Sequence, residues 1–210
     1  ETQQALVDSI KTSGMQLLLA VARTQLGLDA FSQQSNAITT LLDLAGFQTL
    51  FLSDHVTNQP LLDSDLTAVL QIMYRVLMNN PHHVTQQIDA DHLATLTKSL
   101  VLLLNKSLSR ACDPEHGPGI RQTTLLMLLT LAQTANHVRD LILLQDIMPA
   151  LRTVLTILGM LKEDGDHSEH VDRGVLSLAD VIYSVQLIGW LSLCKNAKDD
   201  MRVTGVLQAL

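Results

Sequence analysis

A polar stretch near the end of the chain, DGDHSEHVD at residues 164 to 172, holds the densest group of side chains that could do chemistry. His167 and His170 stand three residues apart, with Glu169 between them and aspartates on both sides. Imidazole and carboxylate groups bind divalent metal ions, so a metal-assisted activity could be centred here. Metal ligands are normally fixed by supporting hydrogen bonds, which a flexible polar insertion lacks. We therefore expect a solvated loop without a bound metal.

Three further histidines and one cysteine are the other candidates. His82, His83 and His92 surround a predicted helix start, where polar side chains meet water and unpaired amide groups, so capping or exposure is their expected role. Cys112 lies in a loop and has no basic pattern beside it that would activate its thiol.

Known catalytic motifs are missing from the sequence. GxSxG, GxxxxGK followed by Ser or Thr, GxGxxG and HExxH do not occur in it. We therefore expect that the chain is not an enzyme and has no cofactor. A metal-assisted activity at His167, Glu169 and His170 is the enzymatic alternative.

Composition and charge restrict the kinds of protein that this chain can be. The 210 residues are 47% hydrophobic and 3% aromatic, which is typical of a helical globular protein. The formal net charge of -7 gives no excess of basic residues that would bind nucleic acid. The longest strongly apolar run, Leu125 to Ala132, is far shorter than the roughly 20 residues that span a bilayer. No charged-then-apolar leader stands at the start, so a signal peptide is either absent or removed. Two cysteines make no disulfide framework, so we expect an intracellular protein, cytoplasmic or nuclear.

Apolar residues recur at three- and four-residue steps, which predicts helices. The predicted helices are Ala5 to Leu26, Ala37 to Phe51, Leu66 to Leu77, Leu93 to Leu104, Ile120 to Leu131, Val138 to Leu161 and Val175 to Leu193. The stretches between them, at 54 to 65, 79 to 83, 105 to 119 and 162 to 174, are rich in Pro, Gly, Asn, Asp and His and are predicted loops. The fold class is therefore all-α.

The helical pattern also repeats. Asn36, Asn80, Asn136 and Asn196 each begin a short helix of about nine residues, followed by a break and a second apolar helix. The breaks fall at Ala45-Gly46, Ala90-Asp91, Gln145-Asp146 and Thr204-Gly205, and a longer helix precedes at least the last three Asn residues. We expect each Asn to be a helix N-cap, because its side chain can accept hydrogen bonds from exposed amides.

This unit of one short and two longer helices resembles the armadillo repeat, and IMPALRTVL at residues 147 to 155 looks like the start of that family's second helix. The Asn36 to Asn80 spacing is 44 residues, near the armadillo and HEAT period, and the next two spacings are 56 and 60. The excess maps onto the predicted loops at 105 to 119 and 162 to 174. A HEAT-like or irregular helical array is the nearest alternative.

The resemblance implies a right-handed α-solenoid of about four repeats, a single domain over 1–210. The last unit stops at the start of its second helix, so we expect a fragment of a longer protein, because a solenoid needs a capping repeat with a polar outer face. The family's third helices line a concave face that holds an extended peptide. The Asn alignment puts Thr67, Gln71 and Tyr74 in register with Thr123, Met127 and Thr130, and with Tyr183, Leu187 and Trp190.

Steps of three and four place each trio on one helix face, and we expect these stripes to be exposed. The expected partner-binding residues are Thr67, Gln71, Tyr74, Thr123, Met127, Thr130, Tyr183, Gln186 and Trp190. Tyr74, Tyr183 and Trp190 are the predicted apolar anchors, while Gln71, Thr123 and Thr130 are the predicted polar contacts. A core position for Trp190 or Tyr183 is the alternative.

The predicted function is that of a protein-protein interaction module, an adaptor that captures an extended or helical segment of a partner protein. Peptide-binding armadillo proteins of the importin type carry Trp and Asn four apart on the third helix, whereas Ile188 and Ser192 occupy those places here. This departure argues against basic nuclear-import signals as the ligand. The alternative function is a structural section of a larger scaffold, with no groove for a free ligand.

Overall fold

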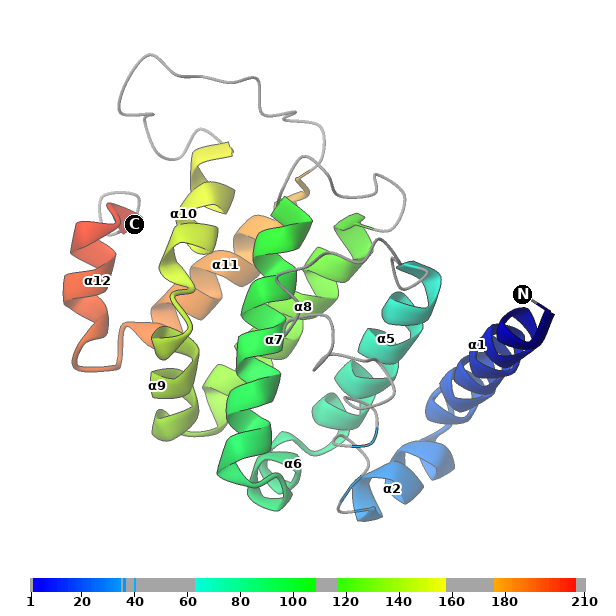
Figure 1. Cartoon of the computed structure of the whole chain (residues 1–210). Helices are drawn as coiled ribbons and strands as arrows, with labels where there is room; N and C mark the ends of the chain where they lie inside the picture. The colour runs from blue at the N-terminus through cyan, green and yellow to red at the C-terminus, as the bar shows by residue number, and fades with distance from the viewer. Residues whose placement is uncertain are drawn as a thin grey trace. The chain divides into compact units, whose positions relative to one another are not determined.

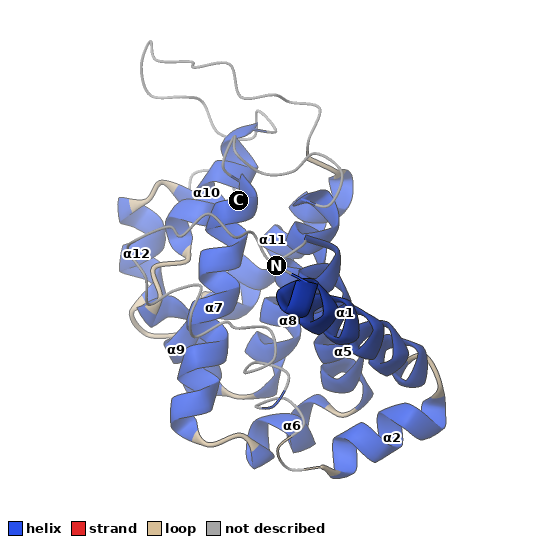
Figure 2. Ribbon diagram, turned by 45° about the vertical axis from the view of Figure 1, so that its right-hand side comes forward, coloured by secondary structure: helices blue, strands red, loops and turns tan. Residues whose placement is uncertain are grey.

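The computed structural model describes residues 2–34, 36, 40, 63–108, 117–157 and 176–206. Within these ranges every regular element is a helix and no residue lies in a strand (Figure 2). The all-α prediction is therefore confirmed. The predicted helix from Ala37 to Phe51 falls almost wholly outside the described residues, as does the whole predicted loop from 162 to 174. No helix in the described ranges is both long enough and apolar enough to cross a bilayer.

The helices pack into two compact units, residues 1–92 and 93–210. The first unit contains α1 (Thr2–Ala22), α2 (Gln25–Gln33), α5 (Asp63–Asn79) and α6 (Pro81–Gln87) (Figure 1). α1 and α2 both pack against α5. The core of this unit comes mainly from α5, where Leu70, Ile72 and Met73 are fully buried.

A tight corner divides what the sequence predicts as one helix from Ala5 to Leu26. The Thr24 hydroxyl accepts a hydrogen bond from the Gly27 amide at 3.1 Å and donates to the Val21 carbonyl at 2.8 Å, so it caps the start of α2. A Cβ atom added at Gly27 would lie 2.1 Å from the Val21 carbonyl oxygen. Only glycine fits this close approach, and apolar spacing alone does not reveal the corner.

The second unit contains most of α7 (Ala90–Leu108), with α8 (Gly117–Thr134), α9 (Asn136–Leu144), α10 (Met148–Ile157), α11 (Leu178–Leu191) and α12 (Ala197–Val203). α11 packs against α8, α9 and α10, and α8 also packs against α9. Leucine, isoleucine, valine and methionine fill the core between these helices.

Two of the predicted repeat corners lie in this unit. The helix predicted from Val138 to Leu161 is interrupted at Gln145 and Asp146, where the repeat comparison placed a break, and α9 has the expected nine residues. Asp146 takes a left-handed backbone conformation with φ of 55°, and Gly205 does so after α12 with φ of 73°. The corner before α7 falls at 88–89, just ahead of the predicted Ala90-Asp91.

Two predicted loops are shorter than expected. Pro81 stands at the start of α6, where its fixed φ suits a helix, so only Asn80 separates α5 from α6. Residues 105–108 continue α7 and residues 117–119 begin α8. A short helix followed by two longer ones occurs as α6, α7 and α8. In α9, α10 and α11 the described part of the second helix has 10 residues against 9 in the first, so the predicted order is not shown there. The stacking of these helices as a solenoid stays a prediction.

The capping prediction is confirmed at Asn80 and wrong at Asn136, and at Asn196 it is right for the N-cap position but not for the side-chain hydrogen bond. The Asn80 side chain accepts a hydrogen bond from the His83 amide at 3.2 Å. Asn136 is instead the first residue of α9, and its side-chain oxygen accepts a hydrogen bond from Arg139. Asn196 holds the N-cap position of α12 without a side-chain capping bond.

Candidate protein-binding site

The helix α11 is unusual in its lack of charge. Its sequence LADVIYSVQLIGWL contains one charged residue, Asp180, which is 0% exposed. Ser177 and Asp180 form a reciprocal cap at its start: the Asp180 amide donates to the Ser177 hydroxyl at 3.3 Å, and the Ser177 amide donates to the Asp180 carboxylate at 2.9 Å. Local sequence therefore fixes where α11 begins and draws its only carboxylate inwards.

A buried ion pair ties the start of α11 to α8. Nη2 of Arg121 lies 3.0 Å from Oδ2 of Asp180, and the two side chains are 1% and 0% exposed. Gln122 adds a hydrogen bond from its Nε2 to the Ser177 hydroxyl at 2.9 Å. Because the charges are paired inside the protein, removing either partner would leave the other buried without this opposite charge.

A second arginine connects the far ends of the same two helices. Nη1 of Arg139, on α9, donates to the carbonyl oxygen of Ala132 in the last turn of α8 at 2.8 Å. The Arg139 guanidinium also lies over the Trp190 ring, 5.6 Å from its centroid, near the end of α11. Since both starts and both ends are connected, α8 and α11 run side by side in the same direction (Figure 1).

α11 has apolar residues on two opposite sides. One side is buried against α8 and α10 and includes Val181, Leu187, Ile188 and Leu191. On the other side, steps of four residues define a row of Leu178, Ile182, Gln186 and Trp190, and Leu193 follows in the turn after the helix. We name these five residues the α11 stripe. All five are exposed, and the exposed fraction of the four apolar side chains runs from 74% at Leu178 to 37% at Trp190. A helix that is apolar on both sides is normally covered on both sides, so this stripe is a candidate contact surface.

Gly189 lies within this exposed side. A Cβ atom there would meet nothing within 4 Å, so no contact with the described residues requires glycine at this place. Glycine in a helix interior is destabilising relative to alanine. Close approach of another backbone to α11 would supply a reason for it.

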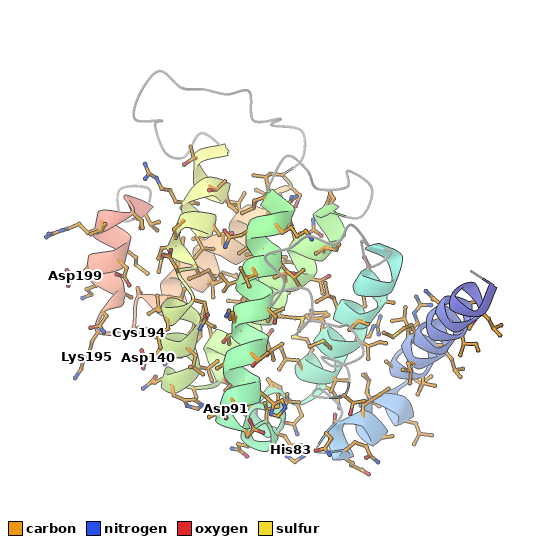
Figure 3. All side chains as sticks on the ribbon, viewed as in Figure 1. His83, Asp91, Asp140, Cys194, Lys195 and Asp199 are labelled. Carbon is orange, nitrogen blue, oxygen red and sulfur yellow. The ribbon has the colours of Figure 1, made fainter. Side chains whose placement is uncertain are left out.

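Cys194 lies just after α11, in surroundings that raise the pKa of its thiol. It is free and buried, and Figure 3 shows it close to Asp140 of α9. Burial raises the pKa of the Cys194 thiol above its ordinary value, and the Asp140 carboxylate, through a hydrogen bond and its charge, raises it further. The nucleophilic thiolate is therefore disfavoured.

The predicted metal and histidine positions separate into two groups. His167, Glu169 and His170 lie outside the described residues, as does Cys112. Among the residues that the structure does describe, no group of three His, Cys, Asp or Glu side chains could hold a metal ion.

The second group lies at the predicted helix start. His92 belongs to the first turn of α7, where its amide donates to the Asp89 carboxylate at 2.9 Å. His82 is exposed and His83 is half-buried, both in α6.

The nine predicted contact residues differ in exposure. Thr67, Gln71 and Tyr74 are half-buried on α5 of the first unit. Gln186 and Trp190 are exposed on α11, and Tyr183 beside them is half-buried. Their role in binding stays a prediction.

On α8 the predicted exposure is partly wrong. Thr123 is half-buried, but Met127 and Thr130 are buried, and Leu187, aligned with Met127, is fully buried on α11. Thr130 donates its hydroxyl to the Leu126 carbonyl at 2.8 Å, which allows a threonine to lie inside. Met127 and Thr130 therefore belong to the core of the second unit.

Three members of the α11 stripe were absent from the predicted set: Leu178, Ile182 and Leu193. Alignment on the Asn residues selected one row of the helix, whereas the exposed row is turned towards Ile182 and Gln186. The uncharged sequence from Val181 to Leu193 was the signal that could have found them, because an outward-facing helix ordinarily carries charges.

The chain was also compared with known proteins. It matches no protein-family model, no curated protein and no solved structure.

Proposed function

We propose that this chain is a protein-protein interaction module of armadillo type that binds a segment of a partner protein along the α11 stripe. The observation that carries the proposal is the uncharged, exposed apolar row on a helix whose opposite side is already buried. The ion pair at Arg121 and the Arg139 contact to Trp190 hold α11 in place, so the row is a preformed surface. Preformed surfaces lose less conformational entropy when they bind.

The shape and chemistry of the stripe indicate the partner. Leu178 and Ile182 at one end and Trp190 and Leu193 at the other would each take an apolar side chain, while Gln186 between them would hydrogen-bond a polar group. A helical segment with apolar residues at three- and four-residue steps fits this row, and Gly189 lets its backbone come close. Tyr183 borders the row. Met127 and Thr130 are omitted from the contact because they are buried.

Peptide display provides the test. A library of random peptides of about 16 residues, long enough for four helical turns, is selected for binding to the whole chain. Recovered peptides are then measured against Ile182→Glu. We expect that the peptides carry apolar residues at helical spacing and that Ile182→Glu weakens their binding by roughly tenfold or more, because a charge enters an apolar contact.

The matched control is Leu144→Glu, which places the same charge on an exposed leucine of α9 outside the stripe. It should leave peptide binding unchanged. Recovery of no specific peptide, or equal loss of binding in both variants, would contradict the proposal and favour a scaffold section that binds no free segment. Circular dichroism of both variants establishes that the helices are intact.

A further inference from the structure

The helix α1 carries a second exposed apolar row in the first unit. We name Leu6, Ile10, Leu17 and Val21 the α1 stripe. All four side chains are exposed, and Leu17 is 67% exposed. They recur at steps of four, seven and four residues, which places them on one side of the helix. Met15, Leu19 and Ala22 are buried on the opposite side. α1 is thus a helix with two apolar sides, one of which packs within its own unit.

The spacing of the α1 stripe is symmetric along the chain. The midpoint between Leu6 and Val21 is also the midpoint between Ile10 and Leu17, and it lies between Ser13 and Gly14. When two such helices pack antiparallel about a two-fold axis through this midpoint, Leu6 meets Val21 of the second copy and Ile10 meets Leu17. Every apolar residue of the row then faces another, as a two-fold interface requires.

The centre of the row carries small residues. Ser13 and Gly14 are both exposed, and a Cβ atom at Gly14 would meet nothing within 4 Å. Glycine weakens a helix interior, and no contact among the residues that the structure describes accounts for it here. In the antiparallel pair Ser13 would lie against Gly14 of the second copy. Because glycine has no side chain and serine has a small one, the two helix axes can come close there. Small residues at the crossing and larger ones towards both ends form a self-complementary surface.

The α1 stripe avoids contact between like charges. The chain has a formal net charge of -7, so two copies repel each other at long range. None of the four stripe residues is charged, and neither are Ser13 and Gly14. The α1 stripe is therefore a face on which two copies can meet without placing like charges in contact.

We propose that two copies of this chain associate through an antiparallel, two-fold pairing of their α1 stripes. The largest apolar patches on monomeric proteins measure roughly 300 to 600 Å², so two such patches bury roughly 600 to 1,200 Å² in total, which is below the size of stable interfaces and in the range of weak, transient ones. The dimer is accordingly weak, with a dissociation constant of roughly tens of micromolar. This proposal does not rest on the proposed function of the α11 stripe.

Sedimentation equilibrium of the whole chain, from about 1 to 300 µM to bracket that constant, tests the proposal. The average mass should rise from that of one chain towards that of two. Leu17→Glu should remain monomeric over the same range with an unchanged circular dichroism spectrum. Leu26→Glu places the same charge on an exposed leucine of α2 outside the stripe, and it should associate like the wild type.

A charge pair tests the register. In the double variant Ile10→Glu, Leu17→Lys each glutamate meets a lysine of the second copy, so association should return. In Ile10→Glu, Leu17→Glu like charges meet, and the chain should stay monomeric. A monomeric wild type, a dimer that Leu17→Glu does not dissociate, or failure of the Glu and Lys pair to restore association would each overturn the proposal. Peptide binding at the α11 stripe is measured separately and does not depend on these outcomes.

Discussion

The guanidinium carbon of Arg139 lies 5.6 Å from the centroid of the Trp190 ring. The same arginine is buried and donates to the Ala132 carbonyl, so the indole covers a charged group that fastens the end of α8. Trp190 therefore has a role inside the second unit as well as an exposed part in the α11 stripe. If substitution of Trp190 abolishes partner binding, either the lost contact with the partner or a weakened second unit is the cause. Stability measurements separate these two causes.

Substitution of Trp190 by alanine should lower the free energy of unfolding by about 1 to 3 kcal/mol, from the lost cation-π contact and the lost apolar burial. Trp190→Phe should cost less because an aromatic face remains over Arg139. Urea denaturation followed by circular dichroism measures both. Leu178→Ala, on the same stripe but 74% exposed, should change stability by less than about 0.5 kcal/mol. Equal losses at Trp190 and Leu178 would contradict the internal role.

The ion pair of Arg121 and Asp180 should show strong coupling. Arg121→Met or Asp180→Leu alone should lower the free energy of unfolding by about 3 to 5 kcal/mol, because each leaves a buried charge without its counterion. The double variant should be less destabilised than the two single losses together, since no buried charge is left. A double-mutant cycle in urea measures the difference. Additive losses would show that the two charges do not depend on each other.

Replacing Gly27 or Gly189 by alanine should change the free energy of unfolding in opposite directions. Gly27→Ala should be strongly destabilising, by about 2 kcal/mol or more, because the added Cβ atom would lie 2.1 Å from the Val21 carbonyl oxygen. Gly189→Ala should raise the free energy of unfolding by about 0.5 to 1 kcal/mol, because it has open space and a helical backbone. Thermal unfolding of the two variants provides the comparison. A destabilising effect at Gly189 would mean that the chain itself packs closely there.

Helix positions were the best-predicted part of the fold because apolar spacing records which side of a helix is buried. The corners between helices were harder to predict. The turn at Thr24 depends on two hydrogen bonds and on the close approach of Gly27, which the spacing of apolar residues does not reveal. The asparagine caps show the same limit. Asn80 caps a helix that Pro81 begins, whereas the side chain of Asn136 accepts a hydrogen bond from Arg139 instead of capping its helix.

The contact surface was predicted only in part. The sequence predicts that Thr130 is exposed, but its hydroxyl donates a hydrogen bond to the Leu126 carbonyl, so the side chain can be buried. Met127 is buried in the same helix. The two arginine contacts that hold α11 join residues 51 to 59 positions apart, and no local pattern predicts which partners meet.

The carboxyl group of Asp89 should titrate below its ordinary pKa of 3.8. Its pKa is lowered first by the hydrogen bond from the His92 amide and then by the His92 side chain, whose Nδ1 lies 2.6 Å away. A lowered folded-state pKa means that the contact stabilises the fold above pH 3.8 and that this contribution is lost as the pH falls through the lower, folded-state value. Carboxyl NMR titration should show His92→Ala recovering only part of the shift, because the amide bond persists. Full recovery would mean that the side chain alone lowers the pKa.

Cys194 should react slowly with iodoacetamide, and Asp140 should control how its rate depends on pH. Burial is the largest cause of the raised pKa of Cys194, and the hydrogen bond and charge of Asp140 add to it. In a Cys112→Ser background, the alkylation rate should therefore still be rising above pH 9.0, the ordinary value for the thiol. Asp140→Asn should move the midpoint of this rise to lower pH, because the negative charge that opposes the thiolate is gone. If Asp140→Asn only loosened the structure, the rate would increase by the same factor at every pH. An unchanged midpoint would therefore contradict the electrostatic role of Asp140, while a lowered midpoint with unchanged helicity would establish it.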